Sequence, residues 1–435
     1  MSDVIIVGAG ITGLSCAWRL KRLGIEPLIL ESSNRAGGVI QSERVGDYLI
    51  EHGPNTLLPT PESFAILDES GLTSEILEGN PRAPRYVYLN RKLRRAPFGP
   101  MSTGGLLRAL EEPFIRSKSP KDESIHHFFV RRFGREAEAR LVSPFVTGIY
   151  AGNTRELSMA ATFPRLVEME RQYGSLVTAM VRSRKPKGTR RGHTCSFADG
   201  MEVLPRRLAA DANISYDTKD LRISRQLEVT WHSGKSHPKA VIVTVPAHRA
   251  IAIFERELQN VARFLEQADY APMVIATTSI ADRDLPQPLR GFGFLVPRSE
   301  KLHLLGTLFS SALFPGRAPQ GRQLLTSFIG GAFEREAIDW PEDRVWDVVR
   351  SELQTVLKTT SPPDPVRIVR HTRAIPQYRI GHEHWTDSLR NEMKCAPGLF
   401  LGGNYMDGVS VAACMETGER IASEVAAFLK RRSRK

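Results

Sequence analysis

The chain has 435 residues, 41% hydrophobic and 25% charged, so it has the composition of a globular protein and the length for two or three lobes. Its formal net charge of +12 points to anionic partners, but the basic residues are spread along the chain without a recognised nucleic-acid-binding module, so no nucleic acid is expected. The four cysteines lie far apart in no CxxC or metal-ligand pattern, which predicts reduced thiols and no metal. We expect neither a signal peptide nor a spanning helix, and a cytoplasmic location.

The first residues carry a nucleotide-binding pattern. The β-branched run Val4–Val7 predicts a buried strand, and it leads through G-x-G-x-x-G into a helix that ends near Leu23. The first glycine of this pattern makes the turn, the second lets a pyrophosphate approach the backbone, and the third lets helix and strand pack closely. The residues expected around the pyrophosphate are Gly8, Ala9, Gly10, Ile11, Thr12 and Gly13.

A second apolar strand at 27–30 completes a βαβ unit. Glu31 follows it, about 20 residues after Gly10, which is the spacing of a carboxylate that binds an adenosine ribose. Two further glycine-containing segments, 35–38 and 51–55, come next. A transiently bound NAD needs no such addition, whereas a permanently bound FAD is gripped along its length. The pattern therefore favours FAD.

The middle of the chain changes character. A helix is expected at 61–72, and the apolar spacing predicts another at 124–140. The second belongs to an inserted helical lobe that spans 86–193 and ends in a basic linker at 182–193. The β-branched run at 240–245 predicts a central strand that returns to the nucleotide domain.

The remaining elements suggest a second sheet and a C-terminal αβ unit. Strands are expected at 273–280, 291–296, 301–308 and 323–330, with a helix at 342–358 after them. A strand at 398–404, a glycine-containing loop and a helix at 411–429 would bring another helix N-terminus to the cofactor. We therefore expect an α/β fold with a discontinuous Rossmann-like FAD-binding domain (1–85, 194–255 and 385–435), the helical lobe (86–193) and a mixed-sheet substrate domain (256–384).

Five segments outside the glycine-rich turn carry a family resemblance. They are SPFVTGIYAGN at 143–153, GFGFLVP at 291–297, GTLFSSALFPGRAP at 306–319, IPQY at 375–378 and GGNYMDGVSVAACMETG at 402–418. Together they resemble the protoporphyrinogen oxidases, over nearly the whole chain. The resemblance implies an FAD enzyme that takes six electrons from a porphyrinogen in three cycles and passes them to O₂, with release of H₂O₂. We expect the FAD to be noncovalent, because no cysteine or histidine lies in a motif that indicates a flavin linkage.

The resemblance also implies roles for individual residues. Glu31 and Ser32 would belong to the adenosine diphosphate site, with Arg35 near the pyrophosphate and Asp220 or Leu221 beside the adenine. The implied flavin contacts are Val39, Gly53, Pro54, Asn55, Thr56, Asn404, Val409, Ser410 and Val411. For the substrate, Arg94 would pair with a propionate, Gly148 would lie beside the reacting carbon, and Leu295 and Phe314 would form apolar walls.

These roles agree with the chemistry of the reaction. A porphyrinogen is a large apolar ring with carboxylates at its rim, so it needs apolar walls and a cation. Hydride transfer to a flavin depends on geometry more than on acid and base groups, which accounts for the lack of an obvious catalytic His, Asp or Glu cluster.

Several alternatives stay open at this point. The substrate is protoporphyrinogen IX, which we favour, or coproporphyrinogen III, and a flavin amine oxidase or a carotenoid-type desaturase would share the fold. The electron acceptor is O₂ or another acceptor such as a quinone. The net charge and the basic linker suggest peripheral attachment of the helical lobe to the anionic inner face of the cell membrane. A homodimer is also open.

Overall fold

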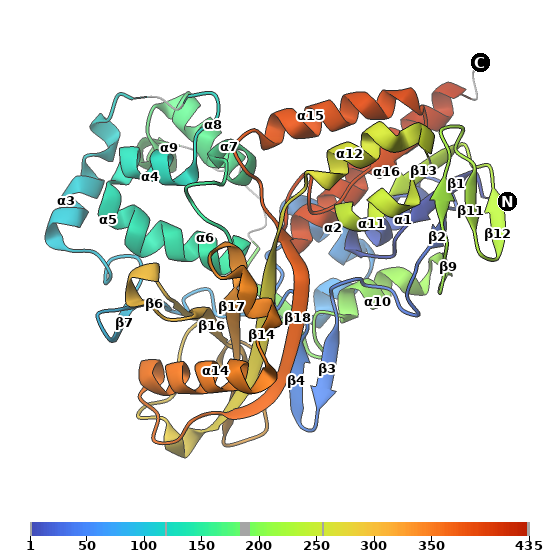
Figure 1. Ribbon diagram of the computed structural model, residues 1–435. Coiled ribbons are helices and arrows are strands. Elements are labelled where there is room, and N and C mark those ends of the chain that lie inside the picture. The colour runs from blue at the N-terminus through green and yellow to red at the C-terminus, as the bar shows by residue number, and fades with distance from the viewer. Residues whose placement is uncertain (1, 118–119, 183–191, 255, 433–435) are drawn as a thin grey trace.

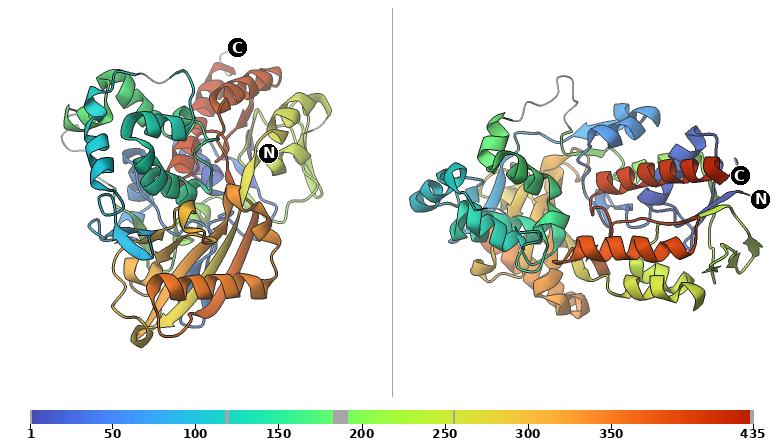
Figure 2. Two further views of the ribbon diagram at one scale, coloured as in Figure 1. Left: turned by 60° about the vertical axis from the view of Figure 1, so that its left-hand side comes forward. Right: turned by 90° about the horizontal axis from the view of Figure 1, so that it is seen from above.

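The computed structural model describes residues 2–117, 120–182, 192–254 and 256–432, so most of the predicted basic linker at 182–193 lies outside the described residues. Figure 1 shows three parts: a helical lobe, a broad twisted sheet below it, and a nucleotide-binding part that holds both α1 (Ile11–Arg22) and α16 (Val411–Arg432). The two further views in Figure 2 place the lobe and the nucleotide-binding part at opposite ends of the molecule.

A five-stranded parallel sheet forms the nucleotide-binding part. Its order is β19 (Leu399–Leu401), β13 (Ala240–Val243), β1 (Val4–Val7), β2 (Leu28–Leu30) and β9 (Asn213–Ser215). Val4 and Ile6 pack in the core that includes α1 and α16, whereas Ile5 and Val7 face the core on the opposite side. Because successive residues of a strand face opposite sides, the sheet is covered on both faces. The predicted central strand is confirmed as β13.

The second sheet has seven strands. Its order is β18 (Asp364–Pro376), β14 (Tyr270–Ala281), β17 (Arg322–Gly330), β16 (Leu304–Phe309), β15 (Gly293–Leu295), β6 (Arg85–Leu89) and β7 (Lys92–Arg95). All neighbours pair antiparallel except β15 and β6, which makes the sheet mixed as predicted. The apolar residues of helix α14 (Glu342–Leu357) pack on one face of this sheet, and the opposite face of the sheet is turned toward the lobe.

The four strands predicted between 273 and 330 are confirmed as β14 to β17. The strand β18 and the helix α15 (His382–Glu392) were not predicted. The division into domains stays a prediction, and its boundary at residue 86 falls inside β6, whose hairpin with β7 extends the seven-stranded sheet.

The helical lobe contains a correction. The expected single helix over 124–140 is wrong, because α4 (Ile125–Phe133) ends at Gly134, whose φ is +88°, a conformation that L side chains rarely adopt. The chain continues as α5 (Arg135–Ala137), a π-helical turn at Glu138–Val142 and α6 (Ser143–Tyr150). Arg132 on α4 is almost fully buried and is paired with Glu112 and Glu170, which ties the lobe together.

The remaining α-helices and β-strands belong to these parts or connect them. They are β3 (Ser42–Val45), β4 (Tyr48–Glu51), α2 (Pro61–Glu69), β5 (Ile76–Glu78), α3 (Thr103–Leu110), α7 (Met159–Thr162), α8 (Pro164–Tyr173), α9 (Leu176–Arg182), β8 (Cys195–Phe197), α10 (Val203–Ala210), β10 (Arg222–Ile223), β11 (Val229–Trp231), β12 (Gly234–Ser236), α11 (Ala247–Ala250), α12 (Gln259–Glu266) and α13 (Ser310–Leu313). Among the described residues, no helix combines the length and the apolar character needed to cross a bilayer. The same ranges hold no group of His, Cys, Asp and Glu side chains that could bind a metal ion.

Candidate active site

The glycine-rich turn between β1 and α1 has the geometry of an anion cradle. Gly8 has φ +102°, and a Cβ on Gly13 would lie 2.1 Å from the carbonyl oxygen of Gly8, so neither position tolerates a side chain. A Cβ on Gly10, in contrast, would meet no atom within 4 Å. Helix α1 starts without a capping side chain, which leaves its first amide groups available to a ligand. The space beside Gly10 therefore fits the pyrophosphate of a dinucleotide.

The carboxylate of Glu31 lies against this turn at the end of β2. One oxygen accepts the amide hydrogen of Ala9 at 2.7 Å, and the other accepts that of Ser33 at 2.8 Å and the hydroxyl of Ser32 at 3.3 Å. The segment after β9 runs alongside, because the Thr218 amide donates to the Glu31 carbonyl at 2.8 Å. Asp220, with φ +54°, and the buried Leu221 follow in this segment. The residues predicted for ribose and adenine therefore lie at one end of the sheet.

A second glycine segment lies next to the first. Gly37 bridges to Gly10, and a Cβ on Gly38 would lie 3.5 Å from the Gly10 Cα. The guanidinium of Arg35 donates to the carbonyl of Gly38 at 2.6 Å, so in this structure it braces the segment from within. The two glycine segments are therefore in direct backbone contact, and together they present a surface without side chains to an extended ligand.

The predicted flavin contacts before β5 form a second group. A Cβ on Gly53 would lie 2.2 Å from the carbonyl oxygen of Val39, so these two backbones touch. The side-chain amide of Asn55 donates to the Gly53 carbonyl at 3.1 Å and thereby braces the Gly53–Thr56 turn around Pro54. The side chain of Val39 is 56% exposed. An exposed apolar side chain next to these glycine segments fits the edge of a bound flavin.

The C-terminal segment supplies the other predicted flavin contacts. Asn404, Val409, Ser410 and Val411 lie between β19 and the first turn of α16. The Ser410 hydroxyl caps this helix by accepting the Ala413 amide hydrogen at 3.1 Å. A Cβ on Gly418 would lie 2.5 Å from the Thr12 carbonyl oxygen, so α16 packs closely on α1. Both helices begin at the carboxyl edge of the parallel sheet, where dinucleotides bind in such folds.

Three of the four predicted substrate residues share one region of the seven-stranded sheet. Leu295 on β15 is paired with Val87 on β6, and Val87 is paired with Arg94 on β7. Because paired residues point to the same face of a sheet, Arg94 and Leu295 share a face and are separated by two strand spacings, roughly 10 Å. Gly148 on α6 covers this face, because a Cβ there would lie 2.4 Å from the Leu295 Cδ2. Arg94 is half-buried, and its Nε donates to the Leu89 carbonyl at 3.3 Å.

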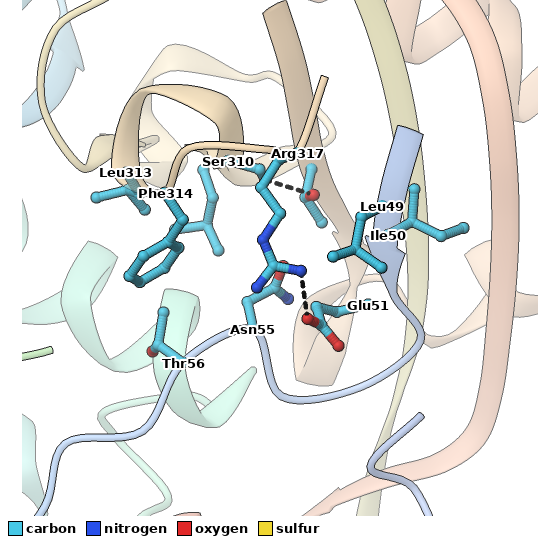
Figure 3. Close-up of a pocket in the computed structure, with 11 residues that line it drawn as sticks. Leu49, Ile50, Glu51, Asn55, Thr56, Ser310, Leu313, Phe314 and Arg317 are labelled. Carbon is cyan, nitrogen blue, oxygen red and sulfur yellow. Dashed lines mark hydrogen bonds and ion pairs between the residues drawn. The ribbon is translucent and has the colours of Figure 1, made fainter. Parts of the chain in front are cut away.

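The fourth substrate residue, Phe314, lies in a pocket on the same face (Figure 3). The pocket is lined by Leu49, Ile50, Glu51, Asn55, Thr56, Leu308, Ser310, Leu313, Phe314, Arg317 and Thr326. It thus joins two predicted flavin contacts to a predicted substrate wall. Leu308 belongs to the same strand face as Gly306, the partner of Leu295, so the pocket continues the face that Gly148 covers.

The pocket contains an ion pair that sequence reasoning missed. Arg317 is 3% exposed and donates to Glu51 at 2.8 Å and to the Ser196 hydroxyl at 2.6 Å. Burial raises the pKa of Glu51, and the facing guanidinium opposes this rise. Both residues lie in segments that the sequence singled out, 51–55 and 306–319. Nothing in the sequence indicates that these segments meet, since Glu51 and Arg317 are 266 positions apart.

The comparisons with known proteins agree with this arrangement. Residues 11–426 match the model of the family described as flavin containing amine oxidoreductase. The chain is 32% identical to protoporphyrinogen oxidase 1, chloroplastic, of Arabidopsis thaliana over 99% of this chain and 89% of the relative. It is 27% identical to coproporphyrinogen III oxidase of Bacillus subtilis (strain 168) over 99% and 100% of the two chains.

Solved structures give the same fold. A crystal structure of a protein from Exiguobacterium sp. 255-15 has a TM-score of 0.81 at 22% identity and covers 98% of both chains. The glycine cradle, the Glu31 carboxylate and the exposed Val39 all fit FAD, which is the cofactor of this enzyme. The chain therefore belongs to the flavin-containing amine oxidoreductase family, in the group of protoporphyrinogen oxidases, and is an FAD-dependent oxidoreductase.

Proposed function

We propose that this enzyme oxidises protoporphyrinogen IX to protoporphyrin IX in tetrapyrrole biosynthesis. The observation that carries the proposal is the row of Leu295, Val87 and Arg94 on one sheet face, with Gly148 above it. Leu295 and Arg94 are partly exposed, whereas Val87 between them is buried, so an apolar side chain and a cation face the same side. This arrangement is complementary to an apolar macrocycle with carboxylates at its rim. The relatives named above support the same substrate class.

The overall reaction removes six hydrogens from the macrocycle in three two-electron steps. Bound FAD supplies the two-electron acceptor for each step, and three O₂ become three H₂O₂ as the flavin is reoxidised. The chain binds and orients the substrate. The backbone of Gly148 lies beside the reacting carbon, Leu295 and Phe314 provide apolar contact, and Arg94 pairs with a carboxylate. The residues around the glycine turn hold the cofactor: Gly8 to Gly13, Glu31, Ser32, Arg35, Asp220 and Leu221.

A second candidate substrate, coproporphyrinogen III, is favoured by the number of cations on the β6–β7 hairpin. Lys92 lies two residues from Arg94 and therefore points to the same face, and its side chain is exposed. A substrate with four carboxylates offers more partners to these two cations than one with two. Parallel turnover measurements with both porphyrinogens under air decide between the substrates.

Substitution of Arg94 tests the substrate site. Loss of a charge-assisted contact of about 1.5 to 3 kcal/mol should lower kcat/KM by about ten- to a hundredfold, mainly through KM, because the contact forms before the chemical step. Arg94→Lys should recover part of this, since an ammonium cannot replace a bidentate fork. Arg95→Ala is the matched control, because Arg95 pairs with Tyr86 and so faces the opposite side of the sheet. FAD content should be unchanged in all three variants, and an Arg94→Ala enzyme with normal KM and kcat would contradict the assignment.

A comparison of electron donors tests the reaction class. Anaerobic mixing with a porphyrinogen should bleach the flavin absorbance, whereas an amine or a carotenoid precursor should leave it unchanged. Bleaching by an amine alone would show that the enzyme is an amine oxidase instead.

We also propose that the enzyme is cytoplasmic and attaches to the inner face of the cell membrane through the helical lobe. Leu107, Leu110 and Phe114 on and just after α3 are 61%, 71% and 83% exposed. Met180 and Val181 near the end of α9, which packs against the turn holding Phe114, are 69% and 81% exposed. Large apolar side chains exposed together on a chain with a net charge of +12 suit an anionic lipid surface.

Flotation with liposomes measures this attachment. Binding should increase with anionic lipid, by about 1 kcal/mol for each engaged Lys or Arg, and should fall when Leu110 and Phe114 are replaced by Glu. Equal flotation with neutral and anionic liposomes would contradict it. A homodimer that buries the same surface would instead show a doubled mass in sedimentation, which the same double substitution would abolish.

A further inference from the structure

The hydroxyl of Tyr378 closes the loop between β19 and α16. It donates to the Asn404 carbonyl and accepts the Gly408 amide hydrogen at 2.8 Å. Within this loop Asn404 and Gly408 are the two ends of a five-residue segment, and Gly403 and Gly408 have φ of +151° and +135°. Between these ends Tyr405 and Met406 are buried and Asp407 pairs with Arg390 and Arg420, whereas the glycines at the ends allow the backbone to turn there. One hydroxyl therefore fixes both ends of the segment that precedes the Val409–Val411 turn.

The ring of Tyr378 is itself held in place. It is 4% exposed and stacks on His382 with the ring centres 4.0 Å apart, and His382 stacks on Trp385 at 5.4 Å. Burial lowers the pKa of His382 to about 4, so the imidazole is neutral near pH 7. Burial also raises the pKa of Tyr378, so its hydroxyl keeps the proton that it donates. The aromatic stack on α15 thus gives the hydroxyl a single position.

The main chain around Tyr378 is bonded to the helical lobe. Its carbonyl accepts the Ser158 amide hydrogen at 2.8 Å, and the neighbouring Gln377 side chain donates to the Tyr150 carbonyl at 2.8 Å. Asp122 of the lobe accepts hydrogen bonds from both the Ser158 hydroxyl and the Gly381 amide, each at 2.6 Å. Tyr378 therefore connects the end of β18, the lobe and the loop after β19.

We propose that Tyr378 is a positioning residue for the flavin end of the cofactor, through the loop that its hydroxyl closes. The inference rests on the proposed flavin contacts at Asn404 and Val409–Val411. When the hydroxyl is absent, the two ends of the segment sample other positions, and FAD binding has to order them, which lowers the affinity. The loss of two neutral hydrogen bonds should weaken FAD binding roughly ten- to a hundredfold.

The test compares Tyr378→Phe with Tyr48→Phe in the full-length apoprotein. Tyr378→Phe keeps the ring and its stacking and removes only the oxygen. Tyr48→Phe is the matched control, because it removes a hydroxyl that bonds Ser279 at 2.7 Å between β4 and β14, outside the loop. FAD affinity is measured by quenching of flavin fluorescence, and the melting temperature of each apoprotein is measured alongside.

We expect Tyr378→Phe to weaken FAD binding roughly ten- to a hundredfold while its apoprotein melts within a few degrees of the Tyr48→Phe apoprotein, which keeps wild-type FAD affinity. Wild-type affinity in Tyr378→Phe would overturn the proposal, as would an equal loss in Tyr48→Phe. Hydrogen exchange in the wild-type protein gives a second test that needs no variant: the Gly408 amide should be protected and gain protection with FAD. Free exchange of that amide would overturn the proposal. Neither measurement uses a porphyrinogen, so a wrong substrate assignment would leave both results unchanged.

Discussion

Replacement of Gly148 by Ala separates the packing role of this residue from its role in catalysis. The new Cβ would lie 2.4 Å from the Leu295 Cδ2 and 3.8 Å from its Cγ, against an ordinary carbon contact of about 3.5 to 4 Å, so the clash involves one terminal methyl group. Leu295 can relieve it by leaving its preferred rotamer, which costs about 0.5 to 1.5 kcal/mol. Alanine in helix α6 gains about 0.5 to 1 kcal/mol over glycine. The stability of Gly148→Ala should therefore lie within about 1 kcal/mol of wild type.

The background Leu295→Val provides the control, because valine has no Cδ2. In that background Gly148→Ala should stabilise the protein by about 0.5 to 1 kcal/mol, since the helix gain remains and the clash is gone. Urea denaturation of the four proteins followed by circular dichroism gives the cycle. If Gly148 lies beside the reacting carbon, kcat/KM should fall at least about tenfold in both backgrounds. A stability change that is equal in both backgrounds would refute the packing argument, and an unchanged kcat/KM would refute the catalytic one.

Three further outcomes are expected. Arg317→Met should destabilise the protein by about 3 to 5 kcal/mol in urea denaturation, because the Glu51 carboxylate then stays buried without its counter-charge. The double variant Arg317→Met/Glu51→Leu should recover part of that loss, and a double variant no more stable than the single would contradict this. The free energy of unfolding should fall by about 2 kcal/mol between about pH 8 and pH 5, because the His382 pKa falls from 6.5 to about 4 on folding. The unfolded chain therefore binds a proton at His382 before the folded protein does as the pH drops. His382→Asn should remove this contribution. Gly13→Ala should yield protein without bound FAD, because its Cβ would meet the backbone of Gly8, which cannot rotate away; a yellow Gly13→Ala protein would show that the turn adapts.

The nucleotide-binding end could be predicted from the sequence because its signals are local. A β-branched strand, a glycine turn and a carboxylate about 20 residues later are all set by short-range geometry, and the structure places Glu31 against Ala9 as this pattern requires. The pairing of Gly148 with Leu295 could be anticipated only through the family resemblance, since 147 positions separate them. Their roles in binding remain predictions.

The elements that were missed lack such local signals. Strand β18 carries Arg367, Arg370 and Arg373 and lies at the edge of its sheet, where charged residues replace the apolar alternation that marks an interior strand. The β6–β7 hairpin turns through Asn90 and Arg91 with φ of +53° and +61°, and an arginine at such a position is no turn signal. The ion pair of Arg317 with Glu51 depends on tertiary structure alone.

The parallel sheet also has a consequence for synthesis of the protein on the ribosome. Its interior strand β1 consists of residues 4–7 and pairs with β13 at 240–243, which in turn pairs with β19 at 399–401. At about 5 to 20 residues per second, β1 leaves the ribosome roughly 20 to 80 s before β19 does. One edge of β1 can pair with β2 (residues 28–30) soon after synthesis, but its other edge has no final partner until β13 emerges, and pairing over such long sequence separations is slow. The sheet is therefore completed late in synthesis, and FAD can be bound in full only after translation has reached α16.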